Sequence, residues 1–556
     1  MKIQHIITAL LALASTAGAA TPPAPYGAVP TEQQLQWQRM EWYAFIHFGP
    51  NTYIDMEWGY GDADPSIVNP ANFNAKEIVS VFKQAGMKGM ILTAKHHDGF
   101  CLWPTETTSY DISSTPWKDG HGDMVREFAE ACKDCGIAFG SYISPWDRNC
   151  AEYGKPGYLP VYYKQIEEML TKYGDVFEIW FDGANGGNGY YGGAREKRDI
   201  GNADSYYNFP EVVKLIRGLQ PNCIIWGAEG HGDAFWGGSE KGFVTYPYWN
   251  VAYDDGQSGK NNISAGNVRW PLHRTLPDKP TESEVWLPLE ADVAIRIGWF
   301  WHVNEEHKSP KQIMDDIYMK SVGHGANLIL AVGVNKEGEL SSIDKKTLLR
   351  FANMRNRLLA TDYALDAKAV ASNVRGGDAE NFGPQKLTDE DIESYWCTDD
   401  EVTTGEVELQ LKEPATFDVV RVREQIRLGQ RVQDFAVDAW VDGKWVTIDA
   451  ADANGKSIGN QVMRRVPATT TDKVRLRITK SRACPCISEL SLLKMPEDWD
   501  GLKVTEVESY TARYRRSIMR RWAAHETLYV VISIGMLMFI TTGIVIIAKK
   551  RRHRSK

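Results

Sequence analysis

Short apolar runs alternate with amphipathic helical patterns over more than half of the chain. Six apolar runs have the length and composition of strands, at residues 42–49, 89–99, 137–144, 176–183, 223–230 and 326–333. Helical patterns separate them at residues 74–86, 123–136, 161–174 and 210–220. Strand followed by helix, repeated many times, predicts a parallel sheet with right-handed crossovers. The number of repeats, and the absence of a glycine-rich dinucleotide turn after the first run, favour a (β/α)8-type barrel over residues 30–361.

The pattern changes after residue 366. Short runs that alternate apolar and polar residues recur at 405–411, 418–424, 434–441, 444–449 and 472–478, separated by Gly, Asp and Asn turns. Such short, evenly spaced strands predict an all-β sandwich domain over residues 366–496. Its role stays open between a packing domain and a glycan-binding module, because its loops carry no recognisable motif.

Both ends of the chain carry segments that are typical of export and membrane anchoring. Residues 1–20 combine a basic start, an apolar run and a small-residue pattern, as a cleavable signal peptide does. Residues 528–548 are uncharged and long enough to cross a bilayer as one transmembrane helix, and six Lys or Arg residues follow in a cytoplasmic tail, 549–556. A charged linker, 498–526, precedes this helix. We therefore expect an exported, membrane-anchored protein whose body is periplasmic or extracellular.

Composition narrows the class of partner. The formal net charge of −9 argues against a nucleic-acid binder, whose surface would be basic. The 19 Trp and 24 Tyr residues suit stacking on sugar rings, although aromatic-rich cores use the same residues. Export permits disulfides among the eight cysteines, but their connectivity cannot be deduced from the sequence. Cys132 and Cys135 have no second pair at zinc-like spacing, so we interpret both as packing residues.

Polar residues at the carboxyl ends of the predicted strands define the candidate site, because a barrel assembles its active site there. In the run 176–183, alternation places Trp180 and Asp182 on one face and Ile179 and Phe181 on the other. A carboxylate that is buried beside an indole is costly unless it has partners or a function. Asp182 is therefore a candidate catalytic group, with capping of the next turn as the structural alternative.

Histidines end the first two strands. Adjacent strand residues point to opposite faces, so His96 and His97 are not suited to bind one metal ion together, and we expect no metal in the barrel. Neutral imidazoles, including that of His47, offer one donor and one acceptor, which suits sugar hydroxyls. Glu57 and Trp58 offer a hydroxyl acceptor next to a stacking surface, although a surface Glu and a packed Trp would look the same.

Several of these segments occur together, in the same order, in one known family. They are WYAFIHFGPNTY, KHHDGFCLWPT, SYISPWDRN, EIWFDGA, GWFWH and SVGHGANLILAVG. The chain thus resembles glycoside hydrolase family 29, the α-L-fucosidases, which also carry a β-sandwich after the barrel. The resemblance implies a retaining enzyme that needs no cofactor and removes terminal α-L-fucosyl residues from fucosylated oligosaccharides or glycoproteins.

The resemblance also implies roles for individual residues. The family's nucleophile falls on Asp182. The acid/base falls on Glu240, in a segment similar to that of the branch acting on α-1,3 and α-1,4 linkages, although Gly238-Ser239 replaces Gly-Asn of that branch. Glu229, at the end of the fifth predicted strand, is the rival. The fucose contacts that carry over are His47, Glu57, Trp58, His96, His97, Tyr142, Trp180 and Trp299.

Two other functions are compatible with the sequence. One is a surface carbohydrate-binding protein built on an inactive hydrolase barrel, against which the retained Asp182, Glu240 and histidines argue. The other is a hydrolase of a sugar of similar shape, such as an α-L-galactoside. The sequence does not define the oligomeric state.

Overall fold

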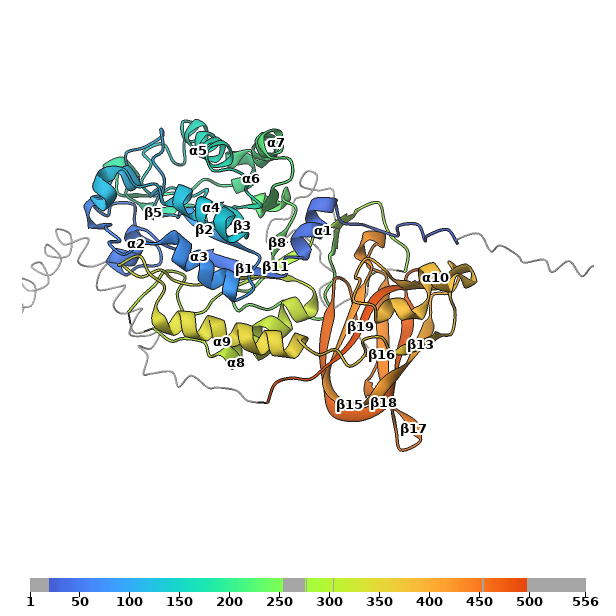
Figure 1. Cartoon of the computed structure of the whole chain (residues 1–556). Helices are drawn as coiled ribbons and strands as arrows, with labels where there is room; N and C mark the ends of the chain where they lie inside the picture. The colour runs from blue at the N-terminus through green and yellow to red at the C-terminus, as the bar shows by residue number, and fades with distance from the viewer. Residues whose placement is uncertain (1–19, 254–275, 277, 304, 453–454, 498–556) are drawn as a thin grey trace, which may run out of the picture.

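The computed structural model describes residues 20–253, 276, 278–303, 305–452 and 455–497 (Figure 1). Nearly all of the expected signal peptide, and the whole of the expected linker, transmembrane helix and tail, lie outside these residues. Within the described ranges, no helix combines the length and the apolar character that a membrane crossing needs.

The first domain is built on eight parallel strands in the order β7-β4-β3-β2-β1-β12-β11-β8. The strands are β1 (Trp42–Ile46), β2 (Gly89–Lys95), β3 (Ala138–Ile143), β4 (Glu178–Trp180), β7 (Ile224–Trp226), β8 (Phe235–Trp236), β11 (Leu289–Ala294) and β12 (Asn327–Ala331). A parallel bridge between Trp226 and Ala234 joins the two edges, so the ring nearly closes. The prediction of a (β/α)8-type barrel is confirmed.

Helices surround this barrel on the outside (Figure 1). The longer ones are α3 (Ala75–Gln84), α4 (Met124–Cys135), α5 (Tyr158–Lys172), α7 (Phe209–Leu219) and α9 (Ser342–Leu359); shorter ones are α2 (Pro50–Ile54), α6 (Ala203–Tyr207) and α8 (Pro310–Gln312). α1 (Glu32–Gln38) covers the amino-terminal end of the barrel, where Trp37 donates to the carboxylate of Glu178. Only a short 3-10 turn separates β7 from β8, so the regular alternation of strand and helix breaks there.

The two faces of the barrel strands belong to two different cores. Ile179 and Phe181 pack in the large core between the strands and the outer helices. Trp180 packs in a separate core inside the barrel, together with Tyr43 and Tyr142. The alternation predicted for the fourth strand is therefore present, and it directs Trp180 toward the barrel axis. Two small antiparallel strand pairs lie outside the barrel sheet: β5 (Gly187–Gly189) with β6 (Glu196–Arg198), and β9 (Val251–Tyr253) with β10 (Glu284–Trp286).

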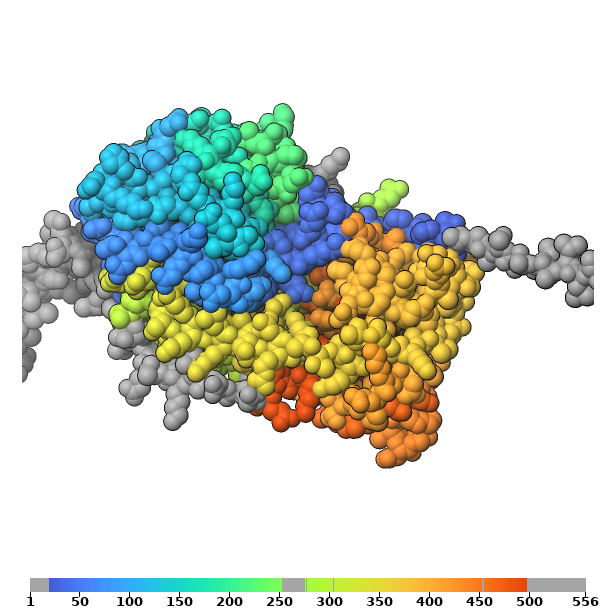
Figure 2. Space-filling view, in the orientation of Figure 1, coloured from blue at the N-terminus to red at the C-terminus, as the bar shows by residue number. Residues whose placement is uncertain are grey.

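The second domain is the predicted β-sandwich, and it packs beside the barrel (Figure 2). Its elements are β13 (Lys368–Ala371), α10 (Ala379–Phe382), β14 (Trp396–Cys397), β15 (Gly405–Glu424), β16 (Val432–Val441), β17 (Lys444–Asp449), β18 (Val462–Ser481) and β19 (Cys486–Leu493). The runs predicted at 405–411 and 418–424 form one continuous strand, β15, whose pairing shifts register between Gln410 and Ala415. β15 pairs with β18 along both halves, with β13 on its first half and with β19 on its second.

Candidate active site

A cavity of about 400 Å³ opens at the carboxyl ends of the barrel strands. Nine of the ten predicted site residues line it: His47, Trp58, His96, His97, Tyr142, Trp180, Asp182, Glu240 and Trp299. The rival acid Glu229 lines it too, whereas Glu57 does not. The strand-end rule located His47, His96, His97, Trp180 and Asp182, and the family resemblance supplied the others.

Asp182 is held in one orientation at the edge of the cavity. The hydroxyl of Tyr142 on β3 donates to its Oδ2 at 3.0 Å, and the backbone N–H of Ala184 donates to its Oδ1 at 2.7 Å. His97 Nε2 lies 3.7 Å from the same Oδ2. Burial raises the pKa of Asp182, and the two hydrogen bonds oppose that rise because they favour the charged form. The side chain keeps 27% of its surface exposed, so the oriented carboxylate can meet a ligand.

The two candidate acids differ in their electrostatic link to Asp182. Glu240 is an exposed residue whose carboxyl is only partly covered; this partial burial raises its pKa, and the negative charges of Asp182 and Glu57 raise it further, against a hydrogen bond with the side chain of Trp299. Burial also raises the pKa of Glu229, but there the neighbouring charge is that of Asp204. A general acid must stay protonated while the nucleophilic carboxylate beside it is charged. The charge of Asp182 favours the protonated form of Glu240 in this way, whereas the charge that acts on Glu229 is that of Asp204.

The floor of the cavity is aromatic. Trp180 stacks on Trp226 with ring centroids 3.5 Å apart and planes 10° from parallel, and Tyr142 stacks on the other side at 5.2 Å. The indole N–H of Trp180 donates to Glu290 Oε1 at 2.9 Å inside the barrel. Because rings cover both of its faces, Trp180 presents its edge to the cavity, and these contacts fix a rigid aromatic floor below it.

The three histidines of the cavity are neutral. Burial lowers the pKa of His47 and His96 well below the usual value and lowers the pKa of His97 to about 3. Nδ1 of His97 lies 2.7 Å from Ser144 Oγ, which fixes that ring. The Nδ1 atoms of His47 and His96, by contrast, are buried with no hydrogen-bond partner within the described part of the chain. A buried polar atom in this state is costly unless a ligand or water satisfies it.

Glu57 lies behind the cavity wall and supports it. Its Oε1 lies 2.6 Å from His302 Nε2, and its Oε2 accepts the backbone N–H of Trp299 at 3.0 Å. His302 Nδ1 lies 2.5 Å from Asp55 Oδ1. Glu57, His302 and Glu305 bring ligand atoms within 4.8 Å of one another, but an imidazole that donates to carboxylates through both nitrogens has no lone pair for a metal ion. This cluster is an ion network that fixes the position of Trp299.

The His302 network predicts a pH-dependent loss of stability. Burial alone would lower the pKa of His302, but Asp55 and Glu57 outweigh burial and raise the pKa to about 9. The charged imidazole therefore stabilises the fold fully below its unfolded pKa of about 6.5, and this contribution of about 3 kcal/mol is lost as the pH rises toward 9. In His302→Gln we expect the fall in unfolding free energy between pH 6 and pH 10, measured with urea, to be smaller by about that amount.

Exposed His121 provides the control for this experiment. His121→Gln should leave the pH dependence of the wild-type protein unchanged. Equal slopes for His302→Gln and the wild type would show that His302 is not charged in the folded protein.

Among the other lining residues, three have polar side-chain groups and had no place in the sequence-based set: Trp226, Trp236 and Asp292. Trp226 ends β7 as Trp180 ends β4, so the same alternation would have found it. Trp236 and Asp292 lie on β8 and β11, which the sequence analysis did not predict as strands. The indole N–H of Trp236 donates to Asp292 Oδ1 at 2.9 Å, and burial raises the pKa of Asp292 well above its usual value. Asp292 therefore keeps its proton to higher pH than a free carboxyl does.

Comparison with known proteins agrees with this geometry. The model of the α-L-fucosidase family matches residues 25–356, which is most of the barrel domain. The chain belongs to the α-L-fucosidase family. The α-L-fucosidase 1 of Arabidopsis thaliana is 37% identical over 474 residues, which cover 84% of this chain and 88% of that protein. The chain is accordingly a glycoside hydrolase, an α-L-fucosidase.

Solved structures of fucosidases show the same architecture. A glycoside hydrolase 29 member from a rumen bacterium superposes with a TM-score of 0.74 at 36% identity, over 88% of this chain and 81% of that one. A Ruminococcus gnavus GH29 fucosidase, solved in complex with fucose, superposes with a TM-score of 0.76 at 31% identity, over 87% of this chain and 99% of that one. Within the sandwich, residues 386–476 are similar to a NedA-like galactose-binding domain.

Proposed function

We propose that this α-L-fucosidase acts by double displacement, with Asp182 as the nucleophile and Glu240 as the acid/base. The observation that carries the proposal is that two carboxyl groups of one cavity differ in their hydrogen bonds and in the charges beside them. Tyr142 and Ala184 hold Asp182 with two hydrogen bonds that favour its charged form. Burial and the charge of Asp182 keep Glu240 protonated to higher pH. Burial raises the pKa of both carboxyls, but the hydrogen bonds on Asp182 favour its charged form, whereas the charge of Asp182 favours the protonated form of Glu240. This difference suits the nucleophile and the acid of a retaining glycosidase.

The reaction proceeds in two steps that exchange one proton. Asp182 attacks the anomeric carbon while Glu240 gives its proton to the leaving glycosidic oxygen. Glu240, now a carboxylate, removes a proton from water, which attacks the fucosyl-enzyme and releases fucose with its configuration retained. His47 and His96 bind the sugar hydroxyls, and Trp58 and Trp299 meet its apolar face and methyl group. Proton NMR of the first product tests this scheme, because immediate release of the β-anomer would indicate inversion.

We further propose that the substrates are α-1,3- and α-1,4-linked fucosyl residues of branched glycans. Support comes from the segment around Glu240, at residues 235–243, which resembles that of the branch with this specificity. Initial rates on Lewis-type trisaccharides, 2′-fucosyllactose, an aryl α-L-fucoside and an aryl α-L-galactoside test the proposal. Equal rates on 2′-fucosyllactose and the Lewis trisaccharides would contradict the linkage preference. Faster cleavage of the galactoside than of the fucoside would contradict the proposal that fucose is the sugar removed.

We propose that the enzyme is exported and held at a membrane by residues 528–548. Support comes from the uncharged run itself and from the basic residues that follow it. A chain that ends at residue 497 should appear in the soluble fraction while the full chain sediments with membranes. If both chains divided equally between the soluble and membrane fractions, the proposal of a membrane anchor would be contradicted.

A further inference from the structure

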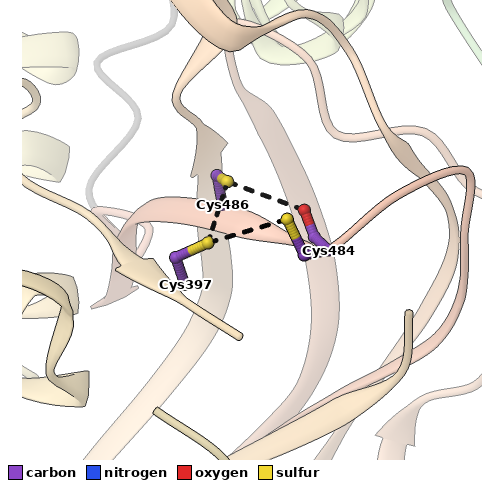
Figure 3. A group of neighbouring side chains, drawn as sticks. All are labelled: Cys397, Cys484 and Cys486. Carbon is purple, nitrogen blue, oxygen red and sulfur yellow. Dashed lines mark hydrogen bonds between the residues drawn. The ribbon is translucent and has the colours of Figure 1, made fainter. Parts of the chain in front are cut away.

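Three cysteines far from the cavity meet inside the β-sandwich (Figure 3). Cys397 lies on β14, Cys486 begins β19, and Cys484 lies two residues before it. Cys397 Sγ lies 3.3 Å from Cys486 Sγ and 3.9 Å from Cys484 Sγ, and all three sulfurs lie within 4.8 Å of one another. Figure 3 shows the sulfur atoms turned toward a common centre. None of the three side chains is more than 2% exposed, and none forms a disulfide.

A buried guanidinium group contacts this cluster. Nη1 of Arg431 lies 3.1 Å from Cys484 Sγ and 3.4 Å from Cys486 Sγ. Its remaining hydrogen bonds within the described ranges go to the backbone carbonyls of Ala24, Leu428 and Cys484, and none goes to a carboxylate. Arg431 is only 1% exposed. A buried cation needs an anionic partner, and among the groups that its guanidinium contacts directly the two sulfurs are the ones that can become anionic.

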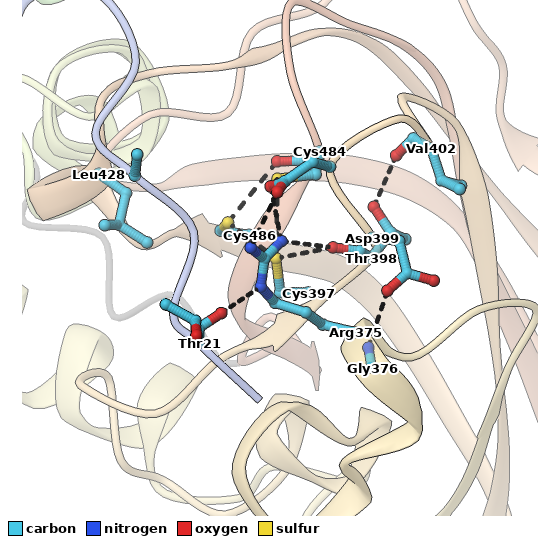
Figure 4. A network of polar contacts seen from close by, with 12 residues as sticks. Thr21, Arg375, Gly376, Cys397, Thr398, Asp399, Val402, Leu428, Cys484 and Cys486 are labelled. Atoms are coloured by element: carbon cyan, nitrogen blue, oxygen red, sulfur yellow. Dashed lines mark hydrogen bonds and ion pairs between the residues drawn. The ribbon is translucent and has the colours of Figure 1, made fainter. Parts of the chain in front are cut away.

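A second arginine near the cluster is already neutralised (Figure 4). Arg375 donates to the carbonyl of Thr21 at 2.6 Å and pairs with both carboxylate oxygens of Asp400, at 2.7 and 3.1 Å. Arg431, by contrast, has no carboxylate hydrogen-bonded to its guanidinium group within the described residues, although the buried carboxyl of Glu424 accepts its backbone N–H. The two arginines also bind the backbone of residues 21–24, so the cluster lies where the amino-terminal segment crosses the sandwich.

We propose that Cys397, Cys484 and Cys486 bind one thiophilic d10 metal ion, Zn²⁺ or Cu⁺, as three thiolates. Around an ion with metal–sulfur bonds of about 2.3 Å, thiolates lie roughly 3.8 Å apart, a spacing that the observed separations bracket. Three thiolates, one Zn²⁺ and one guanidinium sum to zero charge, so the ion and Arg431 together neutralise the site. Three sulfur ligands suit Cu⁺ directly, and Zn²⁺ would take a water as the fourth ligand. The thiol protons leave to solvent when the ion binds.

A disulfide is the competing outcome. Cys397 and Cys486 are opposite one another in the pairing of β14 with β19. Oxidation by a disulfide donor would join their sulfurs, pass two electrons and two protons to the donor, and leave Cys484 outside the bond. Only a metal ion engages all three sulfurs. The expected role of the ion is structural, since the site joins β14, β19 and the amino-terminal segment at a distance from the barrel cavity.

The metal content of the purified full chain tests the proposal directly. Elemental analysis of protein prepared without chelators should give one equivalent of zinc or copper per chain, and the identity of the metal distinguishes the two ions. Cys484→Ser and Cys397→Ser should lose that equivalent. Cys132→Ser, which changes a buried cysteine of α4 outside the cluster, should retain it.

Titration of the metal-free wild-type chain provides a second measurement that does not depend on the folding of any variant. Adding Zn²⁺ or Cu⁺ alone should raise the melting temperature by several degrees with a stoichiometry of one, and Co²⁺ should give thiolate charge-transfer absorption. A chain that neither retains nor takes up one of these ions would overturn the proposal. So would a native chain two hydrogens lighter than the reduced mass, with Cys397 and Cys486 in one disulfide-linked peptide.

Discussion

Asp182→Asn should reduce fucose release by about a thousandfold or more, because an amide cannot attack the anomeric carbon and form the fucosyl-enzyme. The substitution keeps the shape of the side chain, and its amide oxygen can still accept the N–H of Ala184. We therefore expect the loss to appear in kcat, with little change in thermal stability. Hydrolysis of an aryl α-L-fucoside, followed by absorbance of the released phenol, measures it.

Asp175, exposed and just before β4, offers a matched control. Asp175→Asn makes the same chemical change outside the cavity, and its turnover should equal that of the wild type. If Asp182→Asn turned over at a comparable rate, the nucleophile would have to be another carboxylate. Asp292 also lines the cavity, but burial raises its pKa well above the usual value and so disfavours the charged form that attack requires.

The sequence predicted those barrel strands whose apolar runs are long. β1, β2, β3 and β12 are fully or almost fully buried, and their residues read as continuous apolar segments. β8 has two residues, too few for a period to appear. β11 contains two acids, Glu290 and Asp292, which interrupt its apolar pattern. Their partners are the indole groups of Trp180 and Trp236, and only the folded barrel brings these together.

The site residues that could be predicted follow a local pattern along one strand, and the missed ones depend on contacts between distant segments. Asp182 could be located because the alternation along one strand is a local property. The support of Glu57 by His302 could not, because these residues are 245 positions apart and meet only in the folded chain. The cysteine cluster is similar: Cys397 is brought to Cys486 by the pairing of β14 with β19, across 89 positions of sequence. Contacts between distant segments depend on topology, which a periodic pattern does not encode.

Glu240→Ala should lower the rate on natural glycans by roughly a hundredfold to ten-thousandfold, the usual contribution of a general acid. A sugar alkoxide is a poor leaving group and needs the proton of Glu240. An aryl fucoside with an acidic phenol leaves without that help, so its rate of enzyme fucosylation should fall much less. Removal of the base also slows hydrolysis of the intermediate, so azide should restore turnover and yield a fucosyl azide with retained configuration. Rates on both substrates, with and without azide, measure these effects.

The pH profile and a paired variant decide between the two candidate acids. Because the raised pKa of Glu240 keeps its proton to higher pH, the alkaline limb of kcat/KM should report loss of that proton and should disappear in Glu240→Ala with the aryl substrate. Glu229→Ala should leave this limb and the leaving-group dependence unchanged, because Asp204, and not Asp182, is the charge that raises the pKa of Glu229. If Glu229→Ala shows azide rescue and Glu240→Ala does not, Glu229, in the turn after β7, is the proton donor. The effect of the Asp182 charge on the pKa of Glu240 would then have no role in catalysis.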